Sequence, residues 1–520
     1  MSRNASAEAR IPAPPERLNL ATDLLDRHLE AGRGARPALR YRGRTLTYAD
    51  VAAEANRVGN ALRTLGVDLE QRVAIALPDS PEFVAVFLGA IKIGAVALPL
   101  NTLLSPSEYA YQLADSGAKV LIADTAVYAR IAEVRRELHR LRHVIVVGDG
   151  DGALSYEGVV RAASAELSPA DTTKDDMCFW QYSSGTTGAP KAAVHLHHDL
   201  YLTARLYGEH VLGLTAHDRT FSMSKLFFSY GLSNSLALPF TAGACAVLVP
   251  ERADPPLAFA TIASERPTIL FGVPTAYAAM LAAADAGDAD LASVRVCISA
   301  GEALPAPIFA RWRERFGLEI LDGIGSTEVG YIFISNTPGA ARAGTSGRVL
   351  PGYEAKIVDV DDGVGDLWVK GDSTMAQYWR QHEPTKRALQ GEWIVTGDRY
   401  SVDADGFFTY AGRSDDMLRV GAQWVSPIEV EGVLLDHPGV LECAVVGRAD
   451  EDGLTRPVAF VVPKGASAGT RELAESLDAL ARDRLAAHKR PRWIEFRAGL
   501  PKTATGKIQR FRLRSAQEVG

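Results

Sequence analysis

The chain has 520 residues, which exceeds one ordinary domain of about 100–200 residues and predicts two or more packed units. Its 47% hydrophobic and 23% charged residues are typical of globular proteins and exclude a disordered, collagen-like or coiled-coil chain. The 56 Lys and Arg residues stand against 63 Asp and Glu, and the net charge of −7 argues against a general nucleic-acid binder.

The N-terminal residues lack the apolar segment that a signal peptide requires. From about residue 35, strand-length apolar runs alternate with helical patterns, and this alternation predicts parallel sheets covered by helices. A helix is predicted at residues 83–91, and strands are predicted at residues 73–77, 95–98, 120–123, 143–147, 246–249, 268–271 and 295–298. The most hydrophobic stretch, residues 83–100, is interrupted by Lys92, Gly94 and Pro99, so we expect buried structure rather than a membrane span.

From about Gly344 the pattern changes to short strands and turns, which predicts a β-rich portion ending near Arg413. Beyond it, helices are predicted at residues 428–435 and 471–487, and strands at residues 441–446 and 458–463. We therefore predict an α/β protein of two domains. Residues 1–414 form a large N-terminal domain of parallel α/β subdomains plus a β-rich subdomain, and residues 415–520 form a small, mobile α/β C-terminal domain.

Cysteines are few, and no two form a Cys-x-x-Cys pair: Cys178, Cys245, Cys297 and Cys443. Scattered thiols in a long chain indicate a reducing compartment and buried packing. We expect a cytoplasmic protein with no membrane or nucleic-acid partner, either a monomer or a homodimer.

The strongest motif is YSSGTTGAPK at residues 182–191. Its hydroxyl side chains, two glycines and lysine form a loop rich in donors for phosphate oxygens. The spacing differs from that of a Walker A loop, and a Ser/Gly linker is the alternative interpretation.

With this loop the sequence resembles the adenylate-forming superfamily of acyl- and aryl-CoA ligases, stand-alone adenylation domains and luciferases. The resemblance extends from Leu46-Thr47-Tyr48 to the C-terminal PKTATGKIQR. The motifs follow in family order: GEALP at 301–305, DGIGSTE at 322–328, TGD at 396–398, GRSDDMLRVGAQWVSPIEVE at 412–431 and TATGK at 503–507. Motifs that are weak alone are jointly specific when their order is kept.

The resemblance implies that ATP converts a carboxylic acid into an acyl-AMP, whose phosphate leaving group a thiol can then displace. Such a reaction requires charge neutralisation around the α-phosphate more than a nucleophilic side chain. The implied catalytic residues are Lys507, which holds the transition state, Thr327 as a phosphate donor, Glu328 as the Mg²⁺ ligand, and Lys191. Without the family context, Ser-Thr-Glu would be interpreted as a helix cap.

The resemblance also implies binding sites for ATP and coenzyme A. The implied ATP-binding residues are Ser183, Ser184, Gly185, Thr186, Thr187 and Gly188 for the phosphates, Gly301, Glu302, Ala303, Asp322 and Gly323 for adenine, and Asp398 and Arg413 for the ribose side. Gly421 and Ala422 match positions lining the pantetheine tunnel, and Arg490 and Arg492 match positions that contact CoA phosphates. Asp415 resembles the hinge about which the small domain rotates between the two half-reactions. Ordinary turns are the alternative for the glycines and for the Asp415 pair.

The C-terminal segment is strongly basic. Residues 489–514 contain nine Lys or Arg residues and one acid, Glu495, a balance of +8 that leaves −15 for the rest of the chain. A basic segment on an acidic body predicts an anionic ligand, here CoA, and we interpret most of this excess as functional. A solvated charged face is the alternative, and it is our interpretation for Arg510, Arg512 and Arg514.

Residues 225–231 resemble the benzoate-CoA ligase subgroup, in which an aromatic gate precedes a small residue and a tyrosine. The resemblance implies a short, flat pocket for an aromatic acid, formed by Phe228, Ser229, Tyr230, Ala300, Gly325 and Ile332. Ser229 replaces the alanine usual in that subgroup, and a buried hydroxyl needs a partner. This suggests a ring amino or hydroxyl group, as in 2-aminobenzoate or a hydroxybenzoate, unless the serine bonds its own backbone.

We therefore predict an ATP-dependent aryl-acid CoA ligase that uses Mg²⁺. A stand-alone aryl adenylation enzyme that loads a carrier protein is the alternative enzyme, and a nucleotide-sensing module without catalysis is the non-enzymatic alternative. His195, His197 and His198 follow the phosphate loop without a carboxylate or cysteine at metal-ligand spacing, and we interpret them as structural.

Overall fold

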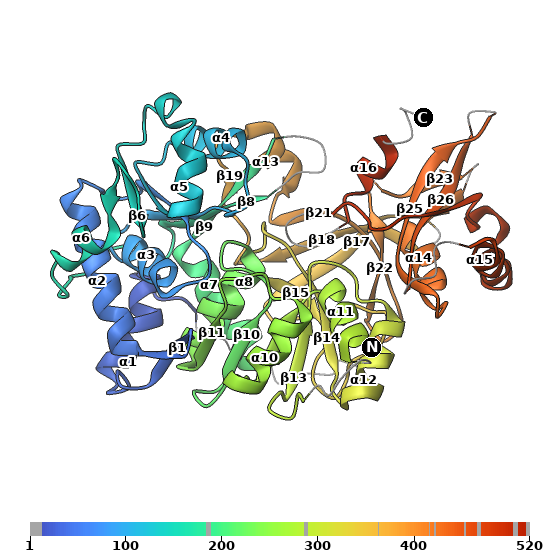
Figure 1. The fold of residues 1–520 in the computed structure, drawn as a ribbon, viewed down its shortest axis with the longest axis horizontal. Coiled ribbons are helices and arrows are strands. Elements are labelled where there is room, and N and C mark those ends of the chain that lie inside the picture. Colours follow the sequence, from blue (N-terminus) through green and yellow to red (C-terminus); the bar gives the residue numbers. More distant parts are fainter. Residues whose placement is uncertain are drawn as a thin grey trace.

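The computed structural model describes residues 13–183, 189–284, 290–361, 363–414, 416–420, 423–451, 454–464, 470–502 and 508–515. Sheets and helices up to β22 form the larger part of the molecule, and the elements from β23 to α16 gather at one end of it (Figure 1).

One large sheet contains the hairpin that precedes and follows the phosphate loop. Over the described residues its order is β19-β9-β8-β4-β3-β5-β6-β7. The strands are β3 (Arg72–Ala76), β4 (Val96–Pro99), β5 (Val120–Asp124), β6 (His143–Val147), β7 (Leu154–Ser155), β8 (Met177–Ser183), β9 (Lys191–Leu196) and β19 (Gln377–Tyr378). The central strands are parallel, whereas β8 and β9 form an antiparallel hairpin.

A second large sheet follows the order β16-β15-β14-β13-β12-β10-β11-β1-β2 within the described part of the chain. Its strands are β1 (Pro37–Tyr41), β2 (Arg44–Thr47), β10 (Arg219–Ser222), β11 (Cys245–Leu248), β12 (Ile269–Gly272), β13 (Val296–Ser299), β14 (Ile320–Gly325), β15 (Ile332–Ser335) and β16 (Arg348–Val349). The strands from β1 to β14 in this order pair in parallel, and β15 pairs with β14 in the antiparallel sense. The predicted site residues Gly323, Gly325 and Ile332 lie in this antiparallel pair.

The β-rich portion is an antiparallel sheet of β17 (Tyr353–Asp361), β18 (Val364–Gly371), β20 (Leu389–Gln390), β21 (Trp393–Val402) and β22 (Phe408–Arg413). The C-terminal unit contains β23 (Leu418–Val420), β24 (Gln423–Val425), β25 (Val440–Ala449), β26 (Thr455–Pro463) and β27 (Trp493–Phe496). Its helices are α14 (Pro427–Leu435), α15 (Arg471–Arg484) and α16 (Arg510–Ser515).

The helices of the larger part are α1 (Arg27–Glu30), α2 (Tyr48–Thr64), α3 (Pro81–Lys92), α4 (Pro106–Ser116), α5 (Thr125–Ala132), α6 (Tyr156–Arg161), α7 (His197–Thr203), α8 (Ser229–Leu232), α9 (Leu238–Ala242), α10 (Pro255–Glu265), α11 (Pro274–Ala284), α12 (Ala306–Phe316) and α13 (His382–Ala388). Local sequence explains where several of them begin. Thr47 and Ser105 form capping boxes with the third residue of α2 and α4, and Ser80 caps α3 in front of Pro81.

The predicted fold class is confirmed, since the predicted strands recur within a residue or two as β3 to β6 and β11 to β13. The helix predicted to reach residue 487 ends earlier, at Arg484. Hydrophobic clusters drawn from residues 418–513 alone give the C-terminal unit its own core. The division at residues 414 and 415 stays a prediction because Asp415 lies outside the described residues. No helix of the described chain is long and apolar enough to cross a membrane.

Candidate active site

The hairpin β8–β9 presents the two ends of the predicted phosphate loop. Ser183, the last residue of β8, pairs directly with Lys191, the first residue of β9. The loop residues Ser184, Gly185, Thr186, Thr187 and Gly188 lie outside the described residues. The two residues that flank the predicted loop, Ser183 and Lys191, therefore lie side by side.

Glu328 meets this hairpin through its side chain. Its Oε1 accepts hydrogen bonds from the Ser183 hydroxyl at 3.3 Å and from the Tyr378 hydroxyl at 2.8 Å. The Lys191 ammonium lies 4.8 Å from the centre of the Tyr378 ring. Three predicted site residues therefore converge, and Tyr378 joins them without any signal in the sequence that points to it.

The backbone carbonyl of Thr327 contacts a buried histidine, His195. His195 Nε2 lies 2.7 Å from the Thr327 carbonyl oxygen, and His195 Nδ1 lies 2.7 Å from an oxygen of Asp199. His195 and Asp199 are fully buried, and the imidazole stacks on Phe179. Both ring nitrogens therefore face oxygen atoms that can accept a hydrogen bond. Contrary to the sequence-based interpretation, His195 does have a carboxylate partner, Asp199, four residues along the chain. Through Nε2 it also contacts the segment of the predicted phosphate donor.

Asp398 and Arg413 form an ion pair on neighbouring strands. They face each other in the register of β21 and β22, with Arg413 Nη1 at 3.2 Å from Asp398 Oδ1. The Asp398 carboxylate and, more weakly, Glu328 raise the pKa of Arg413 against the opposing effect of burial. The two residues predicted to bind the ribose side therefore lie together and within electrostatic range of Glu328.

The predicted adenine side lies at the carboxyl ends of β13 and β14. Gly301, Glu302 and Ala303 follow β13, while Asp322 and Gly323 belong to β14. Asp322 is buried, and burial raises its pKa to about 8. Its carboxylate accepts a hydrogen bond from the Leu304 backbone at 3.3 Å, which ties the segment after β13 to β14.

Residues of the predicted acid pocket converge between α8 and the β14–β15 hairpin. The Tyr230 hydroxyl lies 3.2 Å from the Ile298 carbonyl, near Ala300, and its ring stacks on Tyr331. Gly325 pairs with Ile332, and a Cβ on Gly325 would lie 2.6 Å from the Tyr331 carbonyl oxygen. Phe228 packs on Phe227 at the start of α8.

The Ser229 hydroxyl has a hydrogen-bond partner on β8, the side chain of Gln181. Its hydroxyl donates to Gln181 Oε1 at 2.5 Å, so it bonds a neighbouring strand rather than its own backbone. Ser229 alone therefore does not require a polar group on the substrate. Gln181 was detectable as a polar residue within the apolar run of β8, CFWQYS.

Lys507, the hinge Asp415, and the predicted tunnel residues Gly421 and Ala422 lie outside the described residues. The described residues on either side of 503–507 make contacts of their own. Lys502 pairs with Glu442 and forms an isolated β-bridge with Ile508. Arg510 makes a bidentate ion pair with Glu431, with nitrogen–oxygen distances of 2.8 and 2.9 Å.

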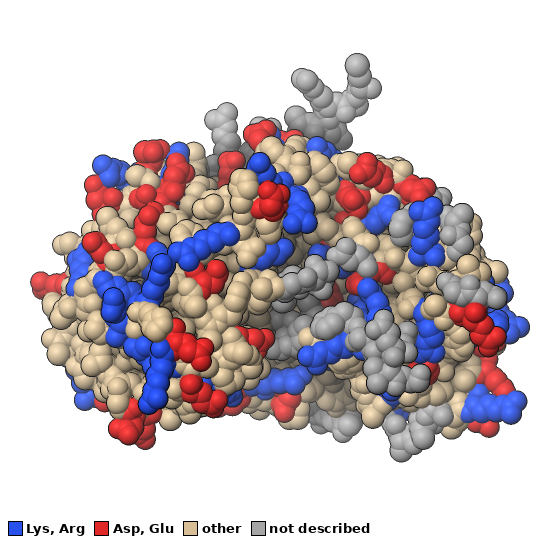
Figure 2. All heavy atoms as spheres, turned by 90° about the horizontal axis from the view of Figure 1, so that it is seen from above, with Lys and Arg blue, Asp and Glu red and all other residues tan. Residues whose placement is uncertain are grey.

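Most of the basic C-terminal segment is paired within its own unit, which corrects our interpretation of this charge. Lys489 binds Glu429 and Arg497 binds Glu495. Arg510 is buried against Glu431 and is therefore not a solvated charge, whereas Arg514 pairs with Asp416 while 38% of its side chain stays exposed. Figure 2 shows basic and acidic side chains interspersed over this end of the molecule.

The two arginines predicted to contact CoA differ. Arg490 donates to the backbone carbonyls of Arg482 and Leu485 at the end of α15. Arg492 is exposed, and its guanidinium makes no hydrogen bond or ion pair within the described residues.

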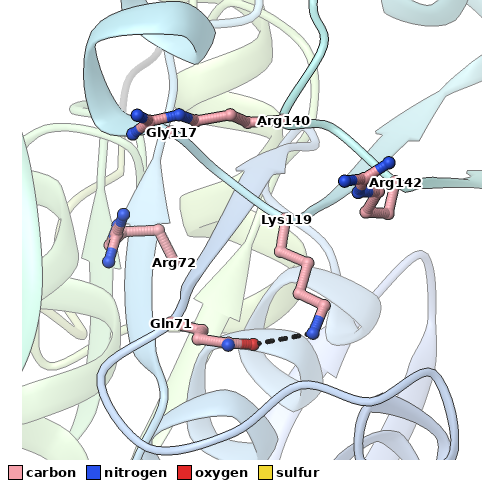
Figure 3. A pocket seen from close by; sticks show the side chains of 6 residues that line it. All are labelled: Gln71, Arg72, Gly117, Lys119, Arg140 and Arg142. Carbon is pink, nitrogen blue, oxygen red and sulfur yellow. Dashed lines mark hydrogen bonds between the residues drawn. The ribbon is translucent and has the colours of Figure 1, made fainter.

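A basic pocket of about 310 Å³ lies elsewhere, lined by Gln71, Arg72, Gly117, Lys119, Arg140 and Arg142 (Figure 3). Arg72 begins β3, and Lys119 and Arg142 precede β5 and β6. These strands run parallel to β8, so the pocket lies at their amino-terminal ends, whereas Ser183 lies at the carboxyl-terminal end of β8. We assign it no part in the candidate site.

The chain combines two large α/β sheets, a β-rich sheet and a C-terminal unit with its own core. The model of the AMP-binding enzyme family matches residues 25–379, and that of the AMP-binding enzyme C-terminal domain matches residues 429–507. The chain belongs to this family.

Similar proteins act on related aromatic acids. The chain is 46% identical to a benzoate–CoA ligase of Thauera aromatica, over 96% of this chain and 97% of that protein. It is 42% identical to a 4-hydroxybenzoate–CoA/benzoate–CoA ligase of Rhodopseudomonas palustris, over 95% and 94%. The crystal structure of the anthranilate CoA ligase AuaEII in complex with anthranoyl-AMP superposes with a TM-score of 0.94 at 45% identity, over 97% and 98%.

Proposed function

We propose that this protein is an ATP-dependent aryl-acid CoA ligase. It converts a benzoate-type acid and ATP into an aroyl-AMP and pyrophosphate, and then transfers the aroyl group to the thiol of CoA with release of AMP. The observation that supports this best is the convergence of Ser183, Lys191 and Glu328 at one end of the β8–β9 hairpin. Relatives with this activity cover nearly the whole chain.

The chain offers a site for Mg²⁺ at Glu328. Only Oε1 of this carboxylate is hydrogen-bonded within the described residues, which leaves Oε2 for a cation. Mg²⁺ commonly binds one or two carboxylates plus substrate phosphates and water, so this single carboxylate fits the ion. When bound, Mg²⁺ neutralises phosphate charge, and Thr327 and Lys191 add a hydroxyl donor and a cation beside it.

The nucleotide is held, in this proposal, between the phosphate loop and the ion pair on β21 and β22. Asp398 accepts hydrogen bonds from the ribose hydroxyls, and Arg413 fixes the orientation of that carboxylate. Gly301, Glu302 and Ala303 face the adenine from the end of β13. Arg492 is the better candidate of the two arginines for a CoA phosphate, because Arg490 already binds two carbonyls.

Lys507 acts in the first half-reaction by neutralising charge on the acid and the α-phosphate. We expect Lys507→Ala to abolish pyrophosphate exchange but to leave thioester formation from synthetic aryl-AMP and CoA largely intact. Equal loss of both half-reactions would remove Lys507 from the adenylation step. A proline at the hinge, Asp415→Pro, should slow turnover while ATP binding is retained.

A panel of aromatic acids, scored by AMP release with and without CoA, tests the function. We expect release to require CoA and at least one substituted or unsubstituted benzoate. Adenylation in the presence of CoA, with no CoA consumed, would favour the carrier-loading alternative. Absence of AMP release with every acid would contradict an aryl-acid ligase.

A further inference from the structure

Gln181 is a buried polar residue beside the predicted acid pocket, with 2% of its surface exposed. Side chains alternate along a strand, so Gln181 shares a face of β8 with Phe179 and Ser183. Trp180 and Tyr182 point to the opposite face and pack in a separate hydrophobic cluster. The Gln181 amide therefore lies on the side of the sheet where Ser183 meets Glu328.

The hydrogen bond with Ser229 leaves this amide half satisfied. The serine gives its proton to Gln181 Oε1, so its oxygen retains only acceptor capacity. Gln181 Nε2 is buried and has no hydrogen-bond partner within the described residues. A buried amide nitrogen without an acceptor is costly, and such groups in folded proteins nearly always have a partner. The pair therefore offers a free donor next to a free acceptor.

We infer that Gln181 and Ser229 form a donor–acceptor pair that selects an aryl acid carrying a ring hydroxyl group. This inference rests on the proposed function and names the substrate class of the same site. A hydroxyl matches both atoms at once, since it accepts from Gln181 Nε2 and donates to Ser229 Oγ. An aromatic amine donates to Ser229 but is a poor acceptor, because its lone pair is delocalised into the ring. Unsubstituted benzoate leaves both groups unmatched.

The test compares kcat/KM for benzoate, 2-aminobenzoate and the three hydroxybenzoates in the wild type, Gln181→Leu and Ser229→Ala. Sites that hydrogen-bond a substrate hydroxyl discriminate strongly against analogues that lack it. We expect the wild type to prefer one hydroxybenzoate over benzoate by at least about tenfold. Gln181→Leu should lower that preference by a similar factor while benzoate turnover is kept or raised.

A matched control is Gln112→Leu, which replaces a buried glutamine of α4 outside the pocket and should leave the acid preference unchanged. Thermal unfolding of each variant checks folding, and Gln181→Met provides the same test with a side chain of closer size. The ratio between acids is decisive, because a purely structural role would lower kcat/KM for all acids alike.

Three results would overturn the inference. They are a wild-type preference for 2-aminobenzoate, no preference for any hydroxybenzoate, and an unchanged acid ratio in Gln181→Leu. In each of these cases the ligase activity itself stands. Absence of aryl-CoA with every acid would overturn the proposed function and, with it, the inference.

Discussion

Replacement of His195 separates the two roles that its ring nitrogens combine. Nε2 holds the Thr327 carbonyl, and Nδ1 holds the buried carboxylate of Asp199. Asparagine reaches about as far as Nδ1, and glutamine reaches about as far as Nε2. His195→Asn therefore keeps the contact to Asp199 and loses Thr327, while His195→Gln keeps Thr327 and loses Asp199.

The two variants should fail differently. His195→Gln leaves the Asp199 carboxylate in the core with weaker partners, and removing the partner of a buried carboxylate costs about 3–5 kcal/mol of unfolding free energy. His195→Asn leaves the Thr327 carbonyl without its donor, which costs about 1–3 kcal/mol. It also frees the Ser-Thr-Glu segment, and a misplacement of about 1 Å in a catalytic group lowers the rate about a hundredfold.

The assays are urea unfolding and ATP–pyrophosphate exchange at saturating acid. We expect His195→Asn to lose much more exchange activity than His195→Gln, in the reverse order of their stability losses. His197→Gln is the control, because His197 is equally buried but accepts from the Leu20 backbone, away from the site. Equal exchange rates in the two His195 variants, within about threefold, would refute the positioning role of this residue.

Three further predictions concern the nucleotide, the C-terminal core and pH. Asp398→Asn should raise the KM for ATP about tenfold with little change in kcat, because a charged acceptor for ribose is lost; an unchanged KM would contradict its ribose role. Arg510→Met should cost about 3–5 kcal/mol by leaving Glu431 buried and unpaired, and the double variant with Glu431→Met should recover part of that loss in urea unfolding. Burial lowers the pKa of His28 and His197 from 6.5 to about 4, so unfolding free energy should fall, by up to about 3 kcal/mol for each, as pH drops from 6.5 to 4. A pH titration of stability that stays flat over this range would contradict burial of the two neutral rings.

The fold was largely predictable because each strand of the parallel sheets is a short apolar run flanked by polar turns. β5 and β6 were predicted within a residue, since both faces of such strands are buried and the signal is continuous. The start of α3 was predicted two residues too late, at Phe83 instead of Pro81, although Ser80 followed by Pro81 is a local cap signal. The end of α15 was predicted three residues too late; Leu485 has extended backbone, and the Arg490 guanidinium donates to the carbonyls of Arg482 and Leu485 from beyond the helix.

Site residues could be predicted only where they lie within the motifs of the family. Ser183, Glu328, Asp398 and Arg413 lie in motifs, and the structure brings them near one another. Tyr378 was missed because its contact with Glu328 depends on β19 joining the edge of β9, which no local pattern indicates. The role of Arg510 was missed for the same reason. Nothing in a basic segment indicates that one of its arginines pairs with a buried carboxylate, Glu431, 79 residues earlier in the chain.

The ion pairs on either side of residues 503–507 have a consequence for a chain broken within that segment. Leu513 packs in the C-terminal core, and Arg510 and Arg514 bind Glu431 and Asp416, so the final helix is fastened without help from its own backbone connection. A nick after Lys502 would therefore leave both fragments associated, and in native conditions their combined mass would differ from that of the intact chain only by the water added on hydrolysis. The fragments would separate only in denaturant, and a native gel alone would report such a preparation as intact.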